Sequence, residues 1–298
     1  MRGFRADDHS KRMTISTRRK IALARLASHA VMALRRLGGR DHVARVRRGG
    51  IVWSLDLREG LDFAIYLTGA FERSTVAAYR RLVRPGDVVV DIGANMGAHT
   101  LPLALAVGQR GRILAYEPAA GAFARLVRNI AQNPALARRI HAEQVMLVAD
   151  VAAPLEPSVY ASWPLASTPG AHPLHLGVAL STHGARKLTL DDAIAEAGAE
   201  RVALMKLDVD GHELQVLRGA RDTLKRSRPV IILELAPYTL EERGEDPRNL
   251  LDLLDEFGYA LFDLSGRPLA GPRRALPVIS PGSSINVIAR VPGNGDRG

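Results

Sequence analysis

A short turn and a single acidic residue, each at the end of an apolar run, carry the first sign of chemistry in this chain. The run VVVDI at 88–92 leads into the turn DIGANMG at 91–97, and an Ala/Leu-rich segment follows. The next apolar run ends in AYEP, so Glu117 stands at its carboxyl end. Glycine weakens both strands and helices, so its use in this turn indicates a close approach to the backbone. We expect cofactor contacts from five residues at this edge of an open α/β sheet: Asp91, Gly93, Asn95, Gly97 and Glu117.

The spacing of the two glycines narrows the type of ligand. The turn reads G-x-x-x-G, whereas dinucleotide sites carry G-x-G-x-x-G, and no Lys-Ser/Thr pair follows as in a phosphate-binding P-loop. A carboxylate at the next strand tip is suited to accept both hydroxyls of a ribose. These features predict a site for a nucleoside without phosphates, of which S-adenosylmethionine is the common cofactor. A structural alternative stays open, in which the glycines form only a tight strand–helix turn and Glu117 is a surface residue.

A second group of polar residues lies in the segment MKLDVDGHEL at 205–214. Its apolar start predicts a strand that ends near Asp208, beside the expected position of a methyl group. Methyl transfer to an aliphatic hydroxyl requires alignment and removal of the hydroxyl proton, which are tasks for a carboxylate or a histidine. A further acid, Glu234, ends another predicted strand in ILELAP. The candidate catalytic residues are Asp208, as base or substrate orienter, followed by His212 and Glu234.

Structural explanations compete with catalysis in the same segment. Asp210 is suited to cap the following helix, and Glu213 is favoured by the dipole of that helix. His212 is an early helix residue, for which an exposed position is the ordinary expectation. Glu234 has a buried pairing with Lys206 as its structural alternative.

The same segment also raises the question of a divalent metal, which lowers a hydroxyl pKa in some O-methyltransferases. Its carboxylates and histidine supply suitable ligand atoms. The start Asp208-x-Asp210-Gly resembles a calcium loop, but the later ligands do not follow at the required offsets. We therefore expect no metal. Cysteine is absent from the chain, which removes disulfides, Cys-ligated zinc, iron–sulfur clusters and thiol nucleophiles.

Strands and helices alternate along most of the chain, which predicts βαβ units and a mainly parallel sheet with helices on both faces. Two apolar segments within 51–69 predict a β-hairpin, and a helix follows at 72–83. A long Pro/Gly-rich segment at 150–185 is expected to cover the site or to hide further strands. The other expected strands are 88–92, 112–117, 140–147, 202–207, 230–235, 259–264 and 284–289. The other expected helices are 99–107, 120–129, 191–197, 212–224 and 249–257. Three histidines of the long segment are candidates to enter the site: His172, His175 and His183.

The chain resembles the FkbM-type S-adenosylmethionine-dependent methyltransferases in five segments, namely DVVVDIGANMGAHTLPLA, ILAYEPAAGAFARLVRNIAQN, LMKLDVDGHELQVLRGA, RPVIILELAP and SINVIAR. The resemblance covers roughly residues 70–290. It implies a class I, Rossmann-like methyltransferase fold, in which a seven-stranded, mainly parallel sheet has one antiparallel strand near its edge. It also implies O-methylation, often of a sugar, a polyketide or another secondary metabolite. The family usually carries Glu where this chain has Asp210, and the exchange shortens the reach of that carboxylate.

The net charge of +10 belongs to the start of the chain. Residues 1–48 hold 14 of the 41 Lys/Arg and 3 of the 31 Asp/Glu, so the remainder is close to neutral. That remainder lacks the clustered basic and aromatic residues of a nucleic-acid groove, and we expect no nucleic-acid partner. We therefore divide the chain into a basic tail with an amphipathic helix at 1–48 and a methyltransferase domain at 49–298.

Within the basic tail, residues 17–37 predict a helix with leucines on one face and basic side chains on the opposite one. One interpretation is peripheral attachment to an anionic membrane surface or a partner. The other is a helix whose leucine face packs on the main domain. No apolar run reaches the length of a membrane span and no secretory signal is recognisable, so we expect a cytoplasmic protein. The leucine face holds Leu23, Leu26, Leu34 and Leu37, and the basic face holds Arg18, Arg25, His29 and Arg36.

Three functions are compatible with such a chain. The first is an S-adenosylmethionine-dependent O-methyltransferase with a small or carbohydrate-like acceptor. The second, a nicotinamide-dependent oxidoreductase, requires G-x-G-x-x-G after the first core strand, which is absent. The third, a catalytically inactive binding module, predicts a damaged cofactor turn, yet the turn at 91–97 and Glu117 are intact. The sequence favours the methyltransferase and leaves the acceptor and the oligomeric state open.

Overall fold

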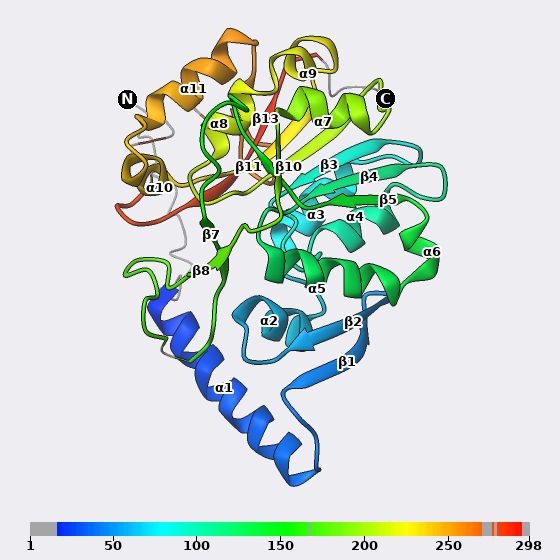
Figure 1. The fold of residues 1–298 in the computed structure, drawn as a ribbon, viewed down its shortest axis with the longest axis vertical. Helices are drawn as coiled ribbons and strands as arrows, with labels where there is room; N and C mark the ends of the chain where they lie inside the picture. Colours follow the sequence, from blue (N-terminus) through cyan, green and yellow to red (C-terminus); the bar gives the residue numbers. More distant parts are fainter. Residues whose placement is uncertain (1–16, 167, 270–275, 277–278, 294–298) are drawn as a thin grey trace, which may run out of the picture.

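The computed structural model describes residues 17–166, 168–269, 276 and 279–293, with the side chains of the first helix described from Arg25 onward. Its centre is a seven-stranded sheet (Figure 1), with the spatial order β12 (Ala260–Phe262), β13 (Ile285–Arg290), β11 (Val230–Leu235), β10 (Leu204–Leu207), β3 (Val88–Ile92), β4 (Arg112–Tyr116) and β5 (Ile140–Glu143). Strand β13 runs antiparallel to both of its neighbours, and the other neighbouring pairs are parallel. The expected fold class and the single antiparallel strand near one edge are thus confirmed.

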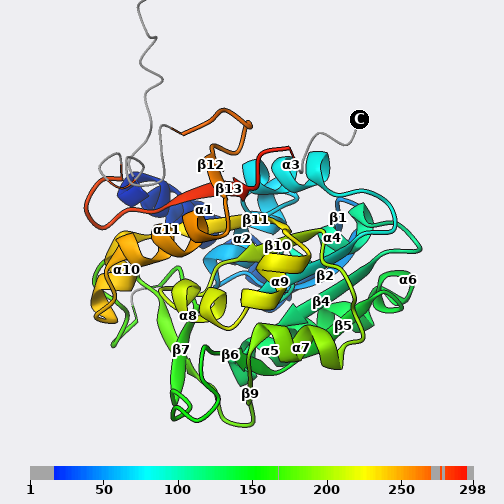
Figure 2. The same cartoon turned by 90° about the horizontal axis from the view of Figure 1, so that it is seen from above.

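Helices cover both faces of this sheet (Figure 2). One core packs against α7 (Leu190–Glu196), α8 (Glu213–Arg218), α9 (Arg221–Arg226), α10 (Pro237–Glu242) and α11 (Pro247–Glu256). The other packs against α2 (Gly60–Thr68), α3 (Arg73–Leu82), α4 (Thr100–Ala106), α5 (Ala120–Ala131) and α6 (Pro134–Ala137). Successive strand residues point to opposite faces, so Val90 of β3 belongs to the first core and Val89 to the second. Because both faces are buried, the core strands are apolar runs.

The expected hairpin at 51–69 is wrong in its second half, because the partner strand lies before residue 51. Strand β1 (Val43–Arg48) pairs antiparallel with β2 (Ile51–Asp56). Gly49 and Gly50 have φ of 57° and 84° and form the two-residue turn between the strands. The division of the chain expected after residue 48 falls at the tip of this hairpin.

The apolar segment after β2 is helix α2, where a strand was expected. A short apolar run does not by itself distinguish a strand from a buried helix. Asp62, in the first turn of α2, accepts a 2.6 Å hydrogen bond from the backbone N–H of Asp56 and also binds the guanidinium of Arg125 in α5. A buried acidic side chain therefore joins this helix to the hairpin and to α5.

The segment at 150–185 contains two strands, β7 (Ser158–Ser162) and β8 (Val178–Ser181), which pair antiparallel. The start of the loop between them is joined to the residues before α2. The carboxylate of Glu59 accepts hydrogen bonds of 2.9 Å from the hydroxyl of Ser162 and from the backbone N–H of Trp163. The loop is therefore anchored near β7.

Two expected elements are each divided in the structure. The strand expected at 140–147 becomes β5 and β6 (Val145–Leu147), and β6 pairs with β9 (Arg186–Leu188) outside the central sheet. The helix expected at 212–224 becomes α8 and α9. At Gly219, between these helices, an added Cβ would lie 2.4 Å from the carbonyl oxygen of Val148, so the chain approaches the segment after β6 closely there.

Helix α1 (Thr17–Leu37) packs on α2 and lies below it in Figure 1. The contact uses small and apolar residues in the middle of α1. The hydroxyl of Ser28 is buried and donates to the carbonyl oxygen of Leu57, and Val31 and Met32 join the core beneath it. Helix α1 is therefore part of the folded body over this length.

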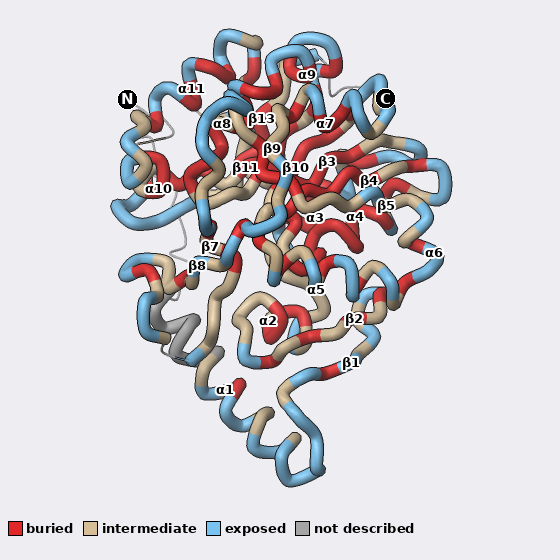
Figure 3. Tube along the Cα trace, viewed as in Figure 1, coloured by how far each residue is buried: buried red, intermediate tan, exposed pale blue. Residues whose placement is uncertain are grey.

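The predicted leucine face of α1 does not make this contact. Leu26, Leu34 and Leu37 are 69%, 70% and 85% exposed, and the outer side of the helix is exposed over most of its described length (Figure 3). The side chain of Leu23, the fourth leucine of this face, lies outside the described residues. Over the described length, the interpretation in which this face covers the main domain is wrong. No helix in the described part of the chain is both long enough and apolar enough to span a bilayer.

Candidate active site

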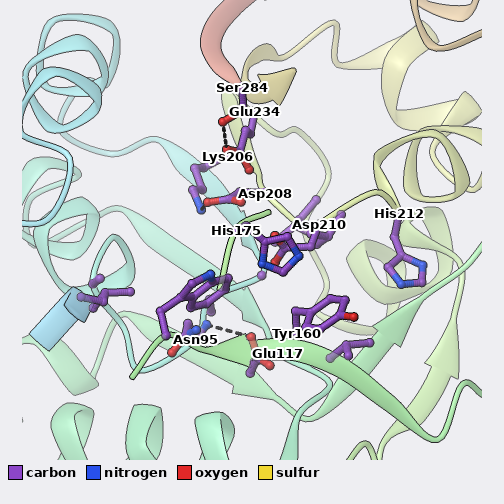
Figure 4. A pocket seen from close by; sticks show the side chains of 18 of the residues that line it. Asn95, Glu117, Tyr160, His175, Lys206, Asp208, Asp210, His212, Glu234 and Ser284 are labelled. Carbon is purple, nitrogen blue, oxygen red and sulfur yellow. Dashed lines mark hydrogen bonds and ion pairs between the residues drawn. The ribbon is translucent and has the colours of Figure 1, made fainter. Parts of the chain in front are cut away.

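A cavity of about 740 Å³ opens at the carboxyl ends of β3, β4, β10 and β11, the edge where the sequence predicts a ligand (Figure 4). Residues of the loop after β7 and of the segment 281–284 form its other sides. Six of the eight predicted site residues line it: Gly93, Asn95, Glu117, Asp208, His212 and Glu234. The order of the βα units therefore brings side chains from distant parts of the chain to one cavity.

The turn after β3 is bound tightly to the neighbouring strands. The backbone N–H groups of Gly93 and Ala94 both donate to the carbonyl oxygen of Tyr116 at 3.0 Å. Gly93 has φ of 78°, and a Cβ added there would lie 1.9 Å from the carbonyl oxygen of Asp208. Close approach of a ligand is therefore not the whole reason for a glycine at position 93. The backbone at Asp208, just after β10, leaves no room for a side chain there.

The other two residues expected to contact the cofactor do not line the cavity. Asp91 is fully buried, and its carboxylate accepts a 2.6 Å hydrogen bond from the hydroxyl of Thr100, which fastens α4 to β3. Gly97 has φ of 95°, and a Cβ added there would lie 3.0 Å from a methyl carbon of Leu126 in α5. Both residues shape the turn from below.

Glu117 faces the cavity as a hydrogen-bond acceptor. The side chain is 3% exposed, and its two oxygens accept from the backbone N–H of Asn95 at 2.8 Å and of Ala119 at 2.9 Å (Figure 4). Burial raises the pKa of Glu117 to about 7, although the two N–H groups oppose that rise. A carboxylate has about four lone-pair sites, so both oxygens can also accept the hydroxyls of a ribose.

The wall beside Glu117 suits an adenine ring. The apolar strand Val145–Leu147 and Val159 of β7 line this part of the cavity. Mostly apolar walls with a few placed polar groups are typical of cofactor pockets. The residues present thus fit the nucleoside half of S-adenosylmethionine, with a carboxylate for the ribose and apolar side chains for the base.

Charged side chains gather at the tips of β10 and β11. The ammonium of Lys206, which is buried, lies 2.7 Å from a carboxylate oxygen of Asp208. Burial acts to raise the pKa of Asp208, but the Lys206 ammonium outweighs burial and lowers that pKa below its usual value. Glu234 accepts a hydrogen bond from the hydroxyl of Ser284, and burial together with the charge of Asp208 raises the pKa of Glu234 well above its usual value. The opposite directions of the two pKa shifts therefore favour an ionised Asp208 beside a protonated Glu234.

This arrangement differs from the pairing considered for Glu234. Lys206 pairs with Asp208, so the structural alternative of a Lys206–Glu234 pair is wrong. The pKa of Lys206 is raised, because burial, which lowers it, is outweighed by Asp208, Asp91 and Glu72. The lysine therefore carries a full positive charge beneath the reactive edge of the cavity.

The turn after β10 also departs from the expected capping. The carboxylate of Glu213 closes the turn by accepting from the backbone N–H of Val209 at 3.1 Å and of Gly211 at 3.0 Å. Asp210 is not the N-cap residue; it has φ of 47° and lines the cavity, and burial raises its pKa well above the usual value. Within the described ranges, no three His, Asp or Glu side chains converge as a metal site would require.

His212 occupies the N-cap position of α8 without a capping hydrogen bond. The side chain is 7% exposed, so the expectation of an exposed histidine is wrong. Its Nε2 lies 3.4 Å from the carboxylate of Glu156, and burial, with a smaller contribution from Arg243, lowers the pKa of His212 to about 4. Figure 4 places His212 apart from Asp208 and Glu234, so two of the three catalytic candidates stand together and the third does not.

Two residues that the sequence analysis did not single out face the same cavity. Glu72 precedes α3 with φ of 43° and accepts a 3.1 Å hydrogen bond from the amide of Asn286. His99 precedes α4, and its Nε2 lies 3.5 Å from the Glu72 carboxylate. The position of His99, at the start of the helix that follows the glycine turn, is the sequence feature that places this residue near the cavity.

The loop after β7 brings aromatic rings into the cavity. The centroid of the His175 ring lies 4.6 Å from that of Tyr160, 6.5 Å from that of Trp163 and 6.4 Å from that of Tyr238. The ring also stacks on His172 at 3.9 Å with an angle of 6° between the planes. The rings of Tyr160, Trp163, His175 and Tyr238 form a largely apolar wall opposite the strand tips, whereas His172 stacks on His175 and is not among the residues that line the cavity.

His175 is neutral and has a defined tautomer in this wall. Burial and the neighbouring His172 lower the pKa of His175 to about 4. Its Nδ1 accepts from the backbone N–H of Gly177 at 3.0 Å, so Nε2 carries the proton. The third histidine of the segment, His183, is exposed and does not line the cavity.

The seven-stranded sheet with one antiparallel strand beside its edge, and the cavity over its central strand tips, define a Rossmann-like methyltransferase. Residues 91–261 match the model of one family, described as the methyltransferase FkbM domain. The chain therefore belongs to the FkbM methyltransferases, and its cofactor is S-adenosyl-L-methionine. The resemblance noted in the sequence is confirmed, and a nicotinamide-dependent oxidoreductase is excluded.

Individual relatives match only parts of the chain, at modest sequence identity. The chain is 30% identical over 173 residues to the hexuronic acid methyltransferase AglP of Haloferax volcanii, covering 57% of this chain and 62% of that protein. It is 40% identical over 68 residues to the 2-O-methyltransferase NoeI of Sinorhizobium fredii, covering 23% of this chain and 28% of that protein. The matches thus span less than two thirds of either relative. The crystal structure of the FkbM methyltransferase of Methylobacillus flagellatus aligns with a TM-score of 0.38 at 17% identity, over 72% of this chain and 50% of that one.

Proposed function

We propose that this protein transfers the methyl group of S-adenosylmethionine to a hydroxyl oxygen of a carbohydrate-like acceptor. The observation that carries the proposal is the contact of 2.7 Å between the carboxylate of Asp208 and the ammonium of Lys206, at the tip of β10 in the same cavity as Glu117. When bound, the cofactor supplies a methyl carbon that its sulfonium activates for in-line displacement by oxygen. The protein then has to hold the nucleoside, orient the hydroxyl and take up its proton.

Glu117 holds the nucleoside by accepting the two ribose hydroxyls. The N–H groups of Asn95 and Ala119 fix the carboxylate in place before any ligand arrives. Asp91 does not contact the nucleoside itself. It fastens α4 to β3 and so keeps the turn that carries Asn95 in position. Pre-positioned groups of this kind lower the ordering cost of binding.

Asp208 orients the acceptor hydroxyl and accepts its proton. The carboxylate is ionised, as a proton acceptor has to be, and the adjacent Lys206 keeps it so. Glu234 stays protonated beside it and limits the charge of the pair to one. When Asp208 accepts the proton of the acceptor hydroxyl, both Asp208 and Glu234 are neutral.

The aromatic wall supports a sugar as the acceptor. The ring faces of Tyr160, Trp163 and Tyr238 offer flat apolar surface to the C–H face of a pyranose, and the Nε2–H of His175 offers one neutral donor among them. AglP is named a hexuronic acid methyltransferase, which agrees with a carbohydrate-like acceptor, and NoeI is named a 2-O-methyltransferase, which agrees with an oxygen atom as the target.

Methyl transfer from radiolabelled S-adenosylmethionine to hexoses, hexuronic acids and oligosaccharides tests the proposal. Asp208→Asn keeps the shape of the side chain and removes the proton acceptor, so we expect kcat to fall by about 10²–10³ while calorimetry shows unchanged cofactor affinity. Asp222→Asn, an exposed carboxylate on α9, is the matched control and is expected to retain full activity. Wild-type turnover by Asp208→Asn would remove the role of Asp208, and labelling of amines in place of hydroxyls would remove O-methylation.

A further inference from the structure

We infer that the outward face of α1 binds an anionic lipid surface. This inference concerns a second surface of the molecule and does not depend on the proposed acceptor. It starts from the exposed leucines of α1, which the body of the protein leaves without a partner among the described residues. It commits to lipid because of the charge that accompanies those leucines.

The orientation of α1 is fixed by polar contacts on its inner side. The hydroxyl of Ser28 donates to the carbonyl oxygen of Leu57 at 3.2 Å. Near the end of the helix, the guanidinium of Arg35 donates to the carbonyl oxygens of Asp41 and Val43, both at 2.9 Å. These bonds hold the helix against α2 and β1, so the opposite side is presented to the surroundings in a defined way.

The presented side is apolar over its described length. Leu26, Leu34 and Leu37 lie on one side of the helix, at 69% to 85% exposure, with Ala30 and Ala33 exposed between them. Single exposed leucines are ordinary on protein surfaces, but a contiguous apolar stripe marks a surface that binds something. The stripe is convex and narrow, which suits insertion between lipid headgroups.

The positive charge around the apolar stripe indicates an anionic binding partner. Helix α1 contains six Lys/Arg and no Asp/Glu, and Arg45 and Arg47 are exposed on the adjacent strand β1. Anionic headgroups complement this charge, and apolar stripes flanked by Lys/Arg are typical of helices that lie in the membrane interface. A second copy of the chain is disfavoured, because a two-fold contact through the same face would bring the two basic helices together.

The anchored helix also lies next to the cavity wall. Helix α1 packs on α2, and Gly60 and Leu61 in the first turn of α2 line the cavity. The N–H of Gly60 donates to the carbonyl oxygen of Trp163 in the loop over the cavity. A lipid surface bound to α1 would therefore stand one helix away from the site of methyl transfer.

Vesicle co-sedimentation of the full chain tests the inference, with vesicles of phosphatidylcholine alone and vesicles containing about one third phosphatidylserine. We expect binding to the anionic vesicles to be at least about tenfold tighter and to weaken with added salt. The combined variant Leu26→Gln, Leu34→Gln, Leu37→Gln is expected to lose at least about tenfold in this affinity. The pair Arg36→Gln, Arg40→Gln, in which both side chains are exposed, is expected to lose a similar factor.

A matched control places three Gln substitutions at exposed apolar residues elsewhere, Leu105, Val127 and Val151, and is expected to bind vesicles as the wild type does. Calorimetry with S-adenosylmethionine is the check that each variant retains a folded cofactor site. Three outcomes would overturn the inference. They are equal affinity of wild type for both vesicle types, wild-type binding by the leucine variant, and leucine-dependent self-association in sedimentation equilibrium.

Discussion

Replacement of Glu117 by Gln tests the central assignment of the cofactor site with a change of a single charge. The carboxylate holds the N–H groups of Asn95 and Ala119 and has lone pairs left for two ribose hydroxyls. In Gln, one oxygen becomes an NH₂ group, which cannot accept from either the backbone or the ribose. A hydrogen bond to a charged group contributes about 1.5–3 kcal/mol. Loss of the charge and of one acceptor is therefore expected to cost about 2–4 kcal/mol of binding, or about 30- to 700-fold in Kd.

Isothermal calorimetry with S-adenosylmethionine measures this loss directly. Glu143→Gln is the matched control, because Glu143 ends the adjacent strand β5 and is paired with Arg186 outside the cavity. We expect its Kd to stay within about twofold of wild type, a change of under 0.5 kcal/mol. An equal Kd for Glu117→Gln and wild type, with both proteins folded, would refute the ribose assignment.

The pH dependence of the same affinity gives an independent check. The pKa of Glu117 in the free protein is raised to about 7 by burial, and only the ionised form accepts both hydroxyls. Binding therefore favours the ionised form, and affinity should fall as pH drops below 7, by about tenfold between pH 8 and pH 6. In Glu117→Gln this dependence should vanish, and its persistence would assign the titration to another group.

Three further predictions concern the same cavity and the strand tips beneath it. Gly93→Ala places a methyl group 1.9 Å from the backbone oxygen of Asp208 and should lower the free energy of unfolding in urea by at least about 3 kcal/mol. Gly86→Ala, also at positive φ but with no atom within 4 Å of the added Cβ, should lower it by only about 1 kcal/mol, and equal losses would contradict the close approach. Lys206→Met removes the cation that lowers the pKa of Asp208, so the ascending limb of the kcat–pH profile should move to higher pH by about one unit or more; an unmoved limb would show that another group sets it. His175→Phe keeps an aromatic ring at this position and removes both the Nε2–H donor and the Nδ1 acceptor of the Gly177 N–H, and we expect acceptor KM to rise about fivefold to tenfold at unchanged cofactor Kd; a change in cofactor Kd alone would place this ring in the nucleoside half.

The edge that carries the site was predictable from local patterns. The run at 88–92 is apolar on both faces because β3 lies at the centre of a covered sheet, and the glycine turn after it marks the strand end. Parallel strands share one carboxyl edge, so Glu117 and Asp208 meet at one cavity although 91 positions separate them in the numbering. The sequence therefore predicts the line of strand tips from the order of elements alone.

The parts that failed depend on contacts across long distances in the chain. Nothing local to the segment after β2 shows that Asp62 will bind the Asp56 N–H and Arg125, so its helix was mistaken for a strand. Glu72 and Asn286 stand 214 positions apart and meet only because β13 inserts beside β11. Side-chain partners of this kind are set by tertiary packing, which periodicity does not encode.

The loop over the cavity is tied to the rest of the protein on two sides. Glu59 binds Ser162 and Trp163 where the loop begins, and farther along the Nε2 of His172 lies 3.1 Å from the carboxylate of Glu242 on α10. Beyond His172, the loop meets the segment 281–284 through an apolar contact of Leu174 with Gly282. We expect acceptor and methylated product to pass the rim of the cavity at Leu174 and Gly282, so the rate of turnover should respond to substitutions at this rim as well as to substitutions at the strand tips.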